Sequence, residues 1–277
     1  MKTLQCGRHR LDLSRPIVMG IVNVTPDSFS DGGRFNDTDA RIAHAFQLLE
    51  EGAQMLDIGG ESTRPGSAPI SLDEELARVV PVLRALRDTG VPLSVDTCKP
   101  EVMRVAIDEG ADMINDIYGF RLPGAREAVA GSAAGLCVMH MKGEPRTMQE
   151  APVYDDVTRE VGEFLADQAR FLIEGGVDPQ RITVDPGYGF GKTATQNYEL
   201  LNRQRDLLSL GFPLFIGVSR KNMIGWATGR PVESRVVGSV VAALEAARRG
   251  ASILRVHDVA ATVDGLKVYL AANQNHA

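Results

Sequence analysis

Short apolar runs alternate along the chain with segments whose apolar residues recur every three or four positions. The stretch from Val91 to Gly119 contains one complete repeat. Its first run, Leu93 to Val95, is followed by a helical pattern that opens at Pro100 and closes at Gly110, and a second run follows at 113–114. Proline suits the first turn of a helix and glycine suits its end. Two short strands joined by one helix form a βαβ unit, which implies a parallel crossover.

The same alternation recurs along the rest of the chain. Strands are predicted at 17–22, 54–58, 93–95, 113–114, 136–140, 181–185, 214–218 and 253–256. Helices are predicted at 38–51, after the capping box of Ser71 and Glu74, from Pro100 to Gly110, at 124–130, 155–174, 196–208 and 233–247, and after Asp258. No linker or low-complexity tract divides this pattern. We therefore predict one α/β domain over 1–277, a single (β/α)8 TIM barrel, with a doubly wound open sheet as the alternative.

Composition narrows the class of partner. The chain has 277 residues and a formal net charge of −6, whereas nucleic-acid-binding proteins usually carry a positive surface. Its 3 cysteines are widely spaced, so a disulfide framework or a zinc site is not expected. The N-terminus lacks the apolar core of a signal peptide, and no run reaches transmembrane length. We expect a cytoplasmic protein that binds neither nucleic acid nor membrane.

Several predicted strands end where apolar residues give way to polar ones, and barrel enzymes place their active sites at that end. Asp96, Asn115, Asp185 and Lys221 all follow such runs. Carboxylates accept hydrogen bonds from ring N–H groups, an amide donates and accepts, and an ammonium donates to a carbonyl oxygen. Together they suit a flat heterocycle. Taken singly, each Asp also fits the cap of the next helix, and Lys221 also fits a solvated surface.

A second group of residues suits an anion. Arg255 and His257 flank the point where the last strand enters the final helix, whose free N–H groups favour phosphate. Thr63 and Arg64 follow the second strand and offer further anion contacts. His257 alone also fits a helix cap. We expect these side chains to form a phosphate site at the barrel rim.

The loop after the first strand reads NVTPDSFSDGGRF. Asn23 and Asp31 supply hard oxygens that suit Mg²⁺, although both residue types are ordinary in turns. Phe29 is an aromatic residue in a polar loop, which is typical of a mobile ligand cover and also of a surface turn with a packed ring. The later segment DPGYGFGK lacks the spacing of a P-loop. Cys98 and Cys137 are predicted to be buried structural thiols.

The motifs that carry these residues resemble those of the dihydropteroate synthases, the folate-pathway enzymes that sulfonamides inhibit. The matching segments, in family order, are NVTPDSFSDGG, DIGGESTRPG, SVDT, INDIYG, VMHMKGEPRTMQ, DPGYGFGKT, GVSRKNMIG and RVHDV. The resemblance implies a barrel, usually homodimeric, that joins p-aminobenzoate to 6-hydroxymethyl-7,8-dihydropterin diphosphate and releases diphosphate with Mg²⁺. It also implies dissociative substitution at the pterin methylene carbon.

Carried over position by position, the resemblance assigns roles to individual residues. Pterin binding falls to Asp96, Asn115, Ile117, Met139, Asp185, Phe190 and Lys221. Diphosphate binding falls to Asn23, Thr63, Arg64, Arg255 and His257. The p-aminobenzoate side is assigned to Phe29, Thr63, Pro65, Phe190, Ser219 and Lys221. The metal ligands are Asn23 and Asp31, and the catalytic residues are Asp31, Lys221, Arg255 and His257.

Two positions depart from the family pattern, and two other functions compete with it. Tyr188 stands where the family commonly has Phe, which would alter packing beside the pterin, and Asn222 stands where it often has a smaller or different residue. A pterin-binding methyltransferase of the methyltetrahydrofolate type would share the barrel, but it has no use for a diphosphate site. A catalytically silent pterin-binding barrel has no use for Asn23 and Asp31.

Overall fold

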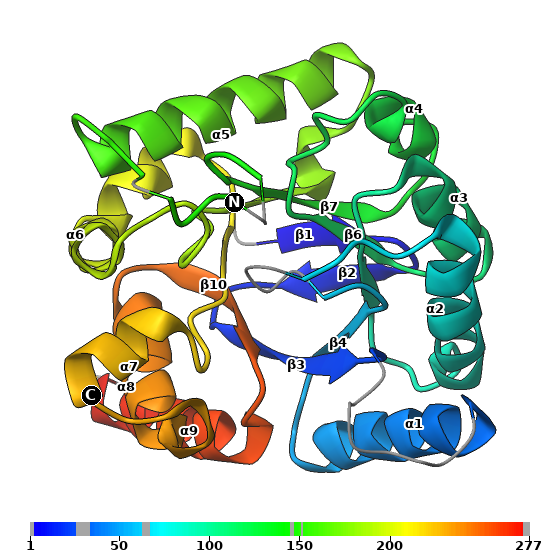
Figure 1. The fold of residues 1–277 in the computed structure, drawn as a ribbon, viewed down its shortest axis with the longest axis horizontal. Coiled ribbons are helices and arrows are strands. Elements are labelled where there is room, and N and C mark those ends of the chain that lie inside the picture. The colour runs from blue at the N-terminus through cyan, green and yellow to red at the C-terminus, as the bar shows by residue number, and fades with distance from the viewer. Residues whose placement is uncertain (1–2, 26–33, 63–66, 145–146, 151, 274–277) are drawn as a thin grey trace.

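The computed structural model describes residues 3–25, 34–62, 67–144, 147–150 and 152–273. Within these residues, eight parallel strands close into a barrel in the order β10, β3, β4, β5, β6, β7, β8, β9 (Figure 1). The strands are β3 (Ile17–Asn23), β4 (Met55–Gly59), β5 (Leu93–Asp96), β6 (Met113–Asp116), β7 (Gly135–Met139), β8 (Ile182–Asp185), β9 (Leu214–Ile216) and β10 (Ala251–Val256). Because β10 pairs with both β3 and β9, the sheet has no open edge. The predicted (β/α)8 barrel is confirmed, and the open sheet is excluded.

Helices surround the barrel on all sides (Figure 1). They are α1 (Arg34–Glu50), α2 (Leu72–Leu86), α3 (Pro100–Asp108), α4 (Ala125–Val129), α5 (Val157–Glu174), α6 (Ala194–Asn202), α7 (Asn222–Thr228), α8 (Val236–Arg248) and α9 (Val259–Asn273), with 3-10 turns η1 (Pro179–Arg181), η2 (Gln204–Leu210) and η3 (Val232–Ser234). Outward strand residues such as Val18 and Leu56 pack with helix residues such as Val79 and Leu165 in one buried cluster. Burial of each such side chain stabilises the folded state by about 1.5–3 kcal/mol relative to leaving it exposed. No helix in the described part of the chain is long and apolar enough to cross a membrane.

Helix boundaries depart from the predictions in several places. α1 begins at Arg34 rather than at residue 38, and the helix predicted at 233–247 is η3 followed by α8. The helix predicted at 196–208 is two elements, α6 and η2. Buried Gln204 donates to the Ala246 carbonyl and accepts from the Tyr188 hydroxyl, and these long-range contacts fix a tighter turn where the pattern indicates a continuous helix. The short helix α7 was not predicted, because its seven residues are fewer than a periodic pattern needs.

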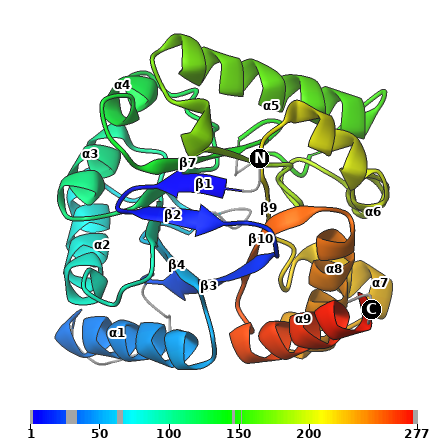
Figure 2. The same ribbon diagram turned by 180° about the vertical axis from the view of Figure 1, so that it is seen from behind.

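An antiparallel hairpin that was not predicted covers one end of the barrel (Figure 2). Its strands are β1 (Thr3–Cys6) and β2 (His9–Asp12). Leu4 and Cys6 join Met19, Met55 and Phe215 in a second buried cluster, separate from the one under the helices. This cluster fills the amino-terminal half of the barrel.

The interior of the barrel changes from apolar to polar toward the carboxyl ends of the strands. Residues two apart on a strand share a face. On β4, Met55 belongs to the apolar interior cluster, so Asp57 points into the same interior one step further along. Asp57 is fully buried. The upper half of the barrel is therefore polar, and it is there that the predicted site residues lie.

Candidate active site

The strand registers bring the predicted polar residues to one level. Asn23 lies opposite Gly59, Gly59 opposite Asp96, and Asp96 opposite Asn115. On the other side of the barrel, Met139 lies opposite Asp185. These residues, distant in sequence, therefore share one end of the barrel, as the strand-end rule predicts.

Arg255 on β10 crosses the barrel and binds two carboxylates. Its Nε donates to Asp57 Oδ2 at 2.6 Å, and its Nη2 donates to Asp96 Oδ2 at 2.9 Å. Asn115 Nδ2 also donates to Asp57 Oδ2, at 3.2 Å. The sequence assigned Arg255 to an anion group and Asp96 to a ring-binding group. The structure joins these two groups through one guanidinium.

Asp57 is the site residue that the sequence analysis missed. It sits inside the apolar strand sequence MLDIG rather than after its last residue, so a search of strand ends passes over it. Its Oδ1 is buried and has no hydrogen-bond partner among the described residues. A carboxylate within a fully buried strand is the signal that identifies it, because buried charges are paired or functional.

Burial shifts the acid–base properties of the carboxylates. Desolvation raises the pKa of Asp96 to about 7, while Arg255 opposes the rise and the neighbouring charge of Asp57 adds to it. Desolvation raises the pKa of Asp185 to about 6, against the attraction of Lys221. Both groups therefore change charge near neutral pH.

Lys221 lies against the loop that follows β8. Desolvation lowers the pKa of Lys221 to about 8, while Asp185 holds it up. The ammonium donates to the Tyr188 carbonyl at 2.5 Å and lies 4.2 Å from the centre of the Phe190 ring. Asp185 Oδ1 accepts from the Gly187 N–H at 2.7 Å, which fixes the start of the same loop. The Tyr188 ring points away from the site, because its hydroxyl bonds Gln204 in the outer layer. The expectation that Tyr188 packs beside a pterin is therefore wrong.

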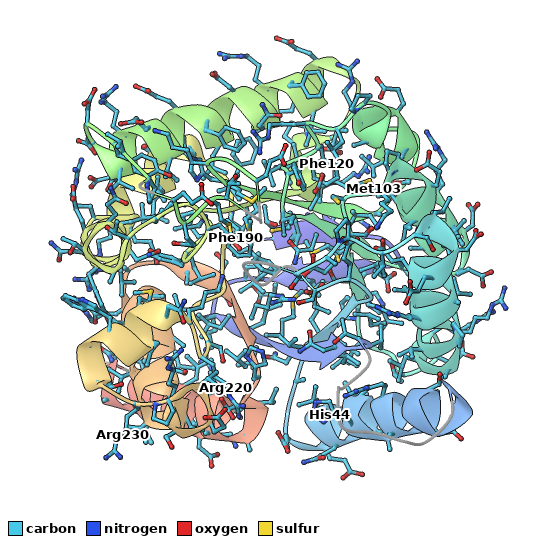
Figure 3. The ribbon with its side chains drawn as sticks, viewed as in Figure 1. His44, Met103, Phe120, Phe190, Arg220 and Arg230 are labelled. Atoms are coloured by element: carbon cyan, nitrogen blue, oxygen red, sulfur yellow. The ribbon has the colours of Figure 1, made fainter. Side chains whose placement is uncertain are left out.

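An apolar wall borders the polar group. Ile117, Met139, Met141 and Met148 form one buried cluster, against which Phe190 packs. Phe190 lies toward the middle of the barrel mouth in Figure 3. The structure thus brings together the three apolar residues that the sequence analysis assigned to a pterin pocket: Ile117, Met139 and Phe190. A planar ring would have apolar contacts on its face and hydrogen bonds at its edge.

The loops after β9 and β10 are tied to each other. Ser219 Oγ accepts from the His257 backbone N–H at 3.2 Å and lies 3.1 Å from His257 Nδ1. Arg220 makes a two-point ion pair with Asp258, with distances of 3.0 and 2.5 Å. His257 and Asp258 stand just before α9 begins at Val259, whereas Ser219 and Arg220 stand just before α7. As predicted, His257 lies beside the start of the final helix.

Five predicted residues, Phe29, Asp31, Thr63, Arg64 and Pro65, lie outside the described residues, so their roles stay predictions. Asn23 is exposed at the end of β3. Among the described residues there is no group of three acidic, His or Cys side chains that suits a metal. A Mg²⁺ bound mainly through substrate phosphates and water needs only one or two protein ligands, so Asn23 is compatible with that kind of site.

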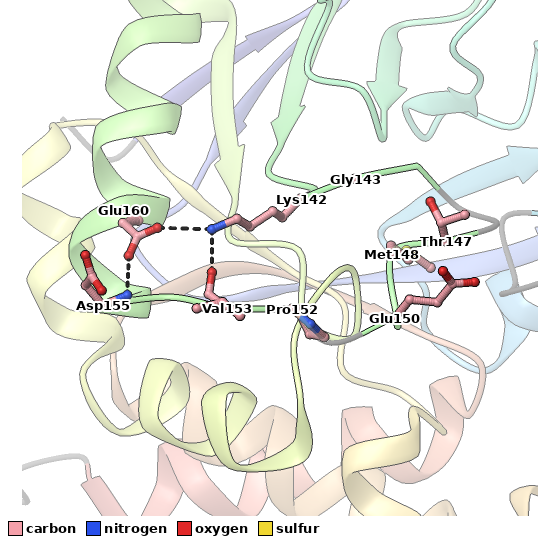
Figure 4. A pocket seen from close by; sticks show the side chains of 9 residues that line it. All are labelled: Lys142, Gly143, Thr147, Met148, Glu150, Pro152, Val153, Asp155 and Glu160. Atoms are coloured by element: carbon pink, nitrogen blue, oxygen red, sulfur yellow. Dashed lines mark hydrogen bonds and ion pairs between the residues drawn. The ribbon is translucent and has the colours of Figure 1, made fainter.

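A separate hollow of about 490 Å³ lies beside the apolar wall, with which it shares Met148 (Figure 4). Lys142 on its rim donates to the Val153 carbonyl and pairs with Glu160. The strand-end residues do not line this hollow. It is therefore distinct from the site at the barrel mouth.

Comparisons with known proteins agree on one family. Residues 19–257 match a family described as pterin binding enzyme. The dihydropteroate synthase of Escherichia coli K12 is 47% identical over 96% of this chain and 95% of its own length. That of Neisseria meningitidis serogroup C is 50% identical over 98% of each.

Solved structures agree. The Xanthomonas albilineans dihydropteroate synthase with 4-aminobenzoic acid has a TM-score of 0.93 and 52% identity over 99% of this chain and 98% of that one. The Burkholderia cenocepacia enzyme complexed with 7,8-dihydropteroate has a TM-score of 0.89 and 51% identity over 98% and 96%.

Proposed function

Because this chain belongs to the pterin-binding enzymes and, within them, to the dihydropteroate synthases, we propose that it joins p-aminobenzoate to 6-hydroxymethyl-7,8-dihydropterin diphosphate, giving 7,8-dihydropteroate and diphosphate. Its family is one of transferases. The observation that carries the proposal is the set of polar groups gathered at one barrel end: Asp96, Asn115, Asp185 and Lys221.

These four polar residues bind the edge of the pterin ring. Asp96 and Asp185 accept hydrogen bonds from ring and exocyclic N–H groups, Asn115 donates and accepts, and Lys221 donates to the ring carbonyl oxygen. A ring with the wrong pattern leaves buried polar atoms unpaired, at a cost of about 1–3 kcal/mol each. Selectivity for pterins follows from this cost.

The leaving group departs on the anionic side. The bond between the methylene carbon and the diphosphate oxygen breaks, and its electron pair leaves with diphosphate. Arg255 and His257 hold the developing charge. A guanidinium has five N–H donors, of which the carboxylates of Asp57 and Asp96 use two, so donors remain for the anion. Asp31 stabilises the cation that the dihydropterin spreads over its ring.

The amine then completes the reaction. The p-aminobenzoate nitrogen forms the new bond to the methylene carbon and loses one proton to water, so no strong general base is needed. Phe190, Ser219 and Lys221 form the part of the p-aminobenzoate site that the structure describes. Phe29, Thr63 and Pro65 complete that site. Sulfonamides compete with p-aminobenzoate for this site. In support, a Yersinia pestis dihydropteroate synthase that is 46% identical to this chain has been solved with a sulfonamide drug complex.

Asn23 and Asp31, with Thr63 and Arg64, are the residues that would hold a Mg²⁺–diphosphate group. When bound, Mg²⁺ neutralises charge on the departing oxygens. The exposed amide of Asn23, at the end of β3, supports this assignment.

The protein acts, in this proposal, as a homodimer in the cytoplasm. In support, α7 and α8 expose apolar side chains: Trp226 is 67% exposed, Val237 77% and Val241 62%. Lone exposed apolar residues are ordinary, but a group of them on adjacent helices is typical of an interface. Sedimentation of the wild type should give twice the monomer mass, and Val241→Lys should give the monomer mass. A monomeric wild type would contradict this part of the proposal.

Diphosphate release tests the function directly. The wild type should release diphosphate over many turnovers only when both substrates are present, with one 7,8-dihydropteroate formed for each diphosphate. Asp185→Ala should abolish pterin binding, whereas Asp31→Ala should spare binding and slow turnover. Release over many turnovers without p-aminobenzoate, or no 7,8-dihydropteroate with both substrates, would refute the synthase assignment.

A further inference from the structure

Lys192 is a buried amine with no role in the reaction described above. It stands at the end of the loop that follows β8, and its side chain is almost completely buried. Its Nζ donates to the carbonyl oxygens of Gly187 at 2.9 Å and Phe190 at 3.1 Å. The third contact, at 2.9 Å, is with His140 Nδ1. Three partners within hydrogen-bond distance satisfy the amine completely.

Burial disfavours the state in which Lys192 and His140 are both protonated. Desolvation lowers the pKa of Lys192 well below its ordinary value, although Asp185 opposes the change. Desolvation, with the nearby charge of Lys192, also lowers the pKa of His140 well below its ordinary value. A neutral His140 leaves Nδ1 able to accept from the amine. The pair can therefore stay hydrogen-bonded across the neutral pH range.

Lys192 and Lys221 bind different carbonyl oxygens of the same loop. Gly187 packs so closely that a Cβ there would lie 1.9 Å from the His140 carbonyl oxygen, and its φ is +67°. The Tyr188 carbonyl, between the two oxygens that Lys192 binds, accepts from Lys221. The Phe190 ring, whose carbonyl Lys192 also binds, lies 4.2 Å from the Lys221 ammonium. Both contacts of Lys221 therefore lie within the 187–190 loop, whose two ends Lys192 binds.

We propose that Lys192 is a positioning residue of the synthase, which sets the place of the Lys221 ammonium at the pterin edge through the 187–190 loop. The proposal rests on the proposed function, since it concerns how that site binds its pterin. His140 completes the arrangement as the third partner of the amine. Lys192 itself contacts no substrate.

A double-mutant cycle tests the proposal. The affinity for 7,8-dihydropteroate is measured by calorimetry at pH 7.5, above the pKa of about 6 of Asp185 and below the pKa of about 8 of Lys221. Lys192→Met should weaken binding about 10-fold when Lys221 is present, and less than about 2-fold in a Lys221→Met background. Coupling of this size separates positioning from a general loss of structure.

Lys142→Met is the matched control. Lys142 is a lysine of the segment after β7 that also donates to a backbone carbonyl, that of Val153, but it does not contact the 187–190 loop through its amine (Figure 4). Its effect should be small and should add to that of Lys221→Met. Hydrogen exchange at the Gly187 and Gly189 amides should rise in Lys192→Met and stay unchanged in Lys142→Met.

The outcomes are distinct. Additive effects of Lys192→Met and Lys221→Met would overturn the proposal, as would unchanged affinity in Lys192→Met. If Lys192→Met does not fold, His140→Phe, which removes one partner and keeps a ring, takes its place in the cycle, and additivity there overturns the proposal equally. A wild type that binds no dihydropteroate and releases no diphosphate would instead refute the proposed function.

Discussion

Replacing Asp57 with Asn is the sharpest test of how the barrel mouth is held together. The change keeps the shape of the side chain and removes its charge. Asp57 Oδ2 accepts from Arg255 Nε at 2.6 Å and from Asn115 Nδ2 at 3.2 Å. Without that charge, we expect Arg255 to turn toward Asp96, where it competes with the pterin for the carboxylate oxygens. The hydrogen bond from Asn115 then ends on a neutral amide oxygen and is weaker.

The structure sets the size of the effect. Two unit charges about 4 Å apart interact by about 4 kcal/mol at an effective permittivity of about 20. Asp96 still pairs with Arg255 in the variant, and the variant no longer desolvates a second carboxylate, so the net loss is smaller. A hydrogen bond to a charged group contributes about 1.5–3 kcal/mol. Product affinity should therefore fall about 10- to 150-fold at pH 8.

The pH dependence carries the signature of this mechanism. Desolvation raises the pKa of Asp96 to about 7 in the wild type, and the charge of Asp57 contributes to that rise. Protonation of Asp96 removes its negative charge and turns one of its oxygens into a donor, which no longer matches the N–H groups of the pterin, so wild-type affinity should fall as pH drops below about 7. Asp57→Asn removes a like charge and lowers the pKa of Asp96. Its deficit should therefore be smaller at pH 6 than at pH 8.

Calorimetric titration with 7,8-dihydropteroate between pH 6 and pH 8.5 measures both effects. Asp112→Asn is the control, because Asp112 is also buried but accepts from the backbone N–H groups of Arg8 and Leu93 instead of Arg255. Equal affinities of Asp57→Asn and the wild type at pH 8 would refute the reasoning. A deficit that does not change with pH would show that Asp57 acts without changing the charge of Asp96.

Three further results are expected. Asp112→Ala should lower the free energy of unfolding by about 1–3 kcal/mol in urea titration, because it leaves the Arg8 and Leu93 backbone N–H groups without their acceptor, and an unchanged midpoint would contradict this. Tyr188→Phe should lower the free energy of unfolding by about 1 kcal/mol through the lost hydrogen bond to Gln204 and should leave the KM for the pterin substrate unchanged. A raised KM would contradict the placement of the Tyr188 ring away from the site. Chelation with EDTA should slow diphosphate release at least about 10-fold, reversibly on adding Mg²⁺, and full activity in EDTA would rule out the metal.

Local rules recovered the barrel and its carboxyl-terminal polar residues. Asp96, Asn115 and Asp185 each end an apolar run, and strand direction in a parallel barrel is enough to bring such residues to one end. Asp57 was not predicted as a site residue, because a strand that is buried on both faces shows no alternation of polar and apolar residues in its sequence. The local sequence therefore does not indicate which of its residues point inward. Only closure of the barrel shows that Asp57 faces Arg255, 198 residues away.

Other features depended on contacts that no local pattern contains. The hairpin strands are four residues each, too short for periodicity to stand out, and they are held by partners in the middle of the chain. Likewise, the place of the Tyr188 ring is decided by buried Gln204 in the next 3-10 turn. The motif alone indicates the loop but not which of its aromatic residues faces the mouth.

The hairpin also bears on the order in which the molecule is assembled. The Gly7 N–H donates to the Ala133 carbonyl, and Arg8 pairs with Asp112, 104 positions downstream, so the hairpin cannot dock during synthesis until these later residues have been made. Docking of the hairpin therefore follows the formation of the strands that it contacts. Protection of the hairpin amides from hydrogen exchange would report that this part of the barrel is already folded.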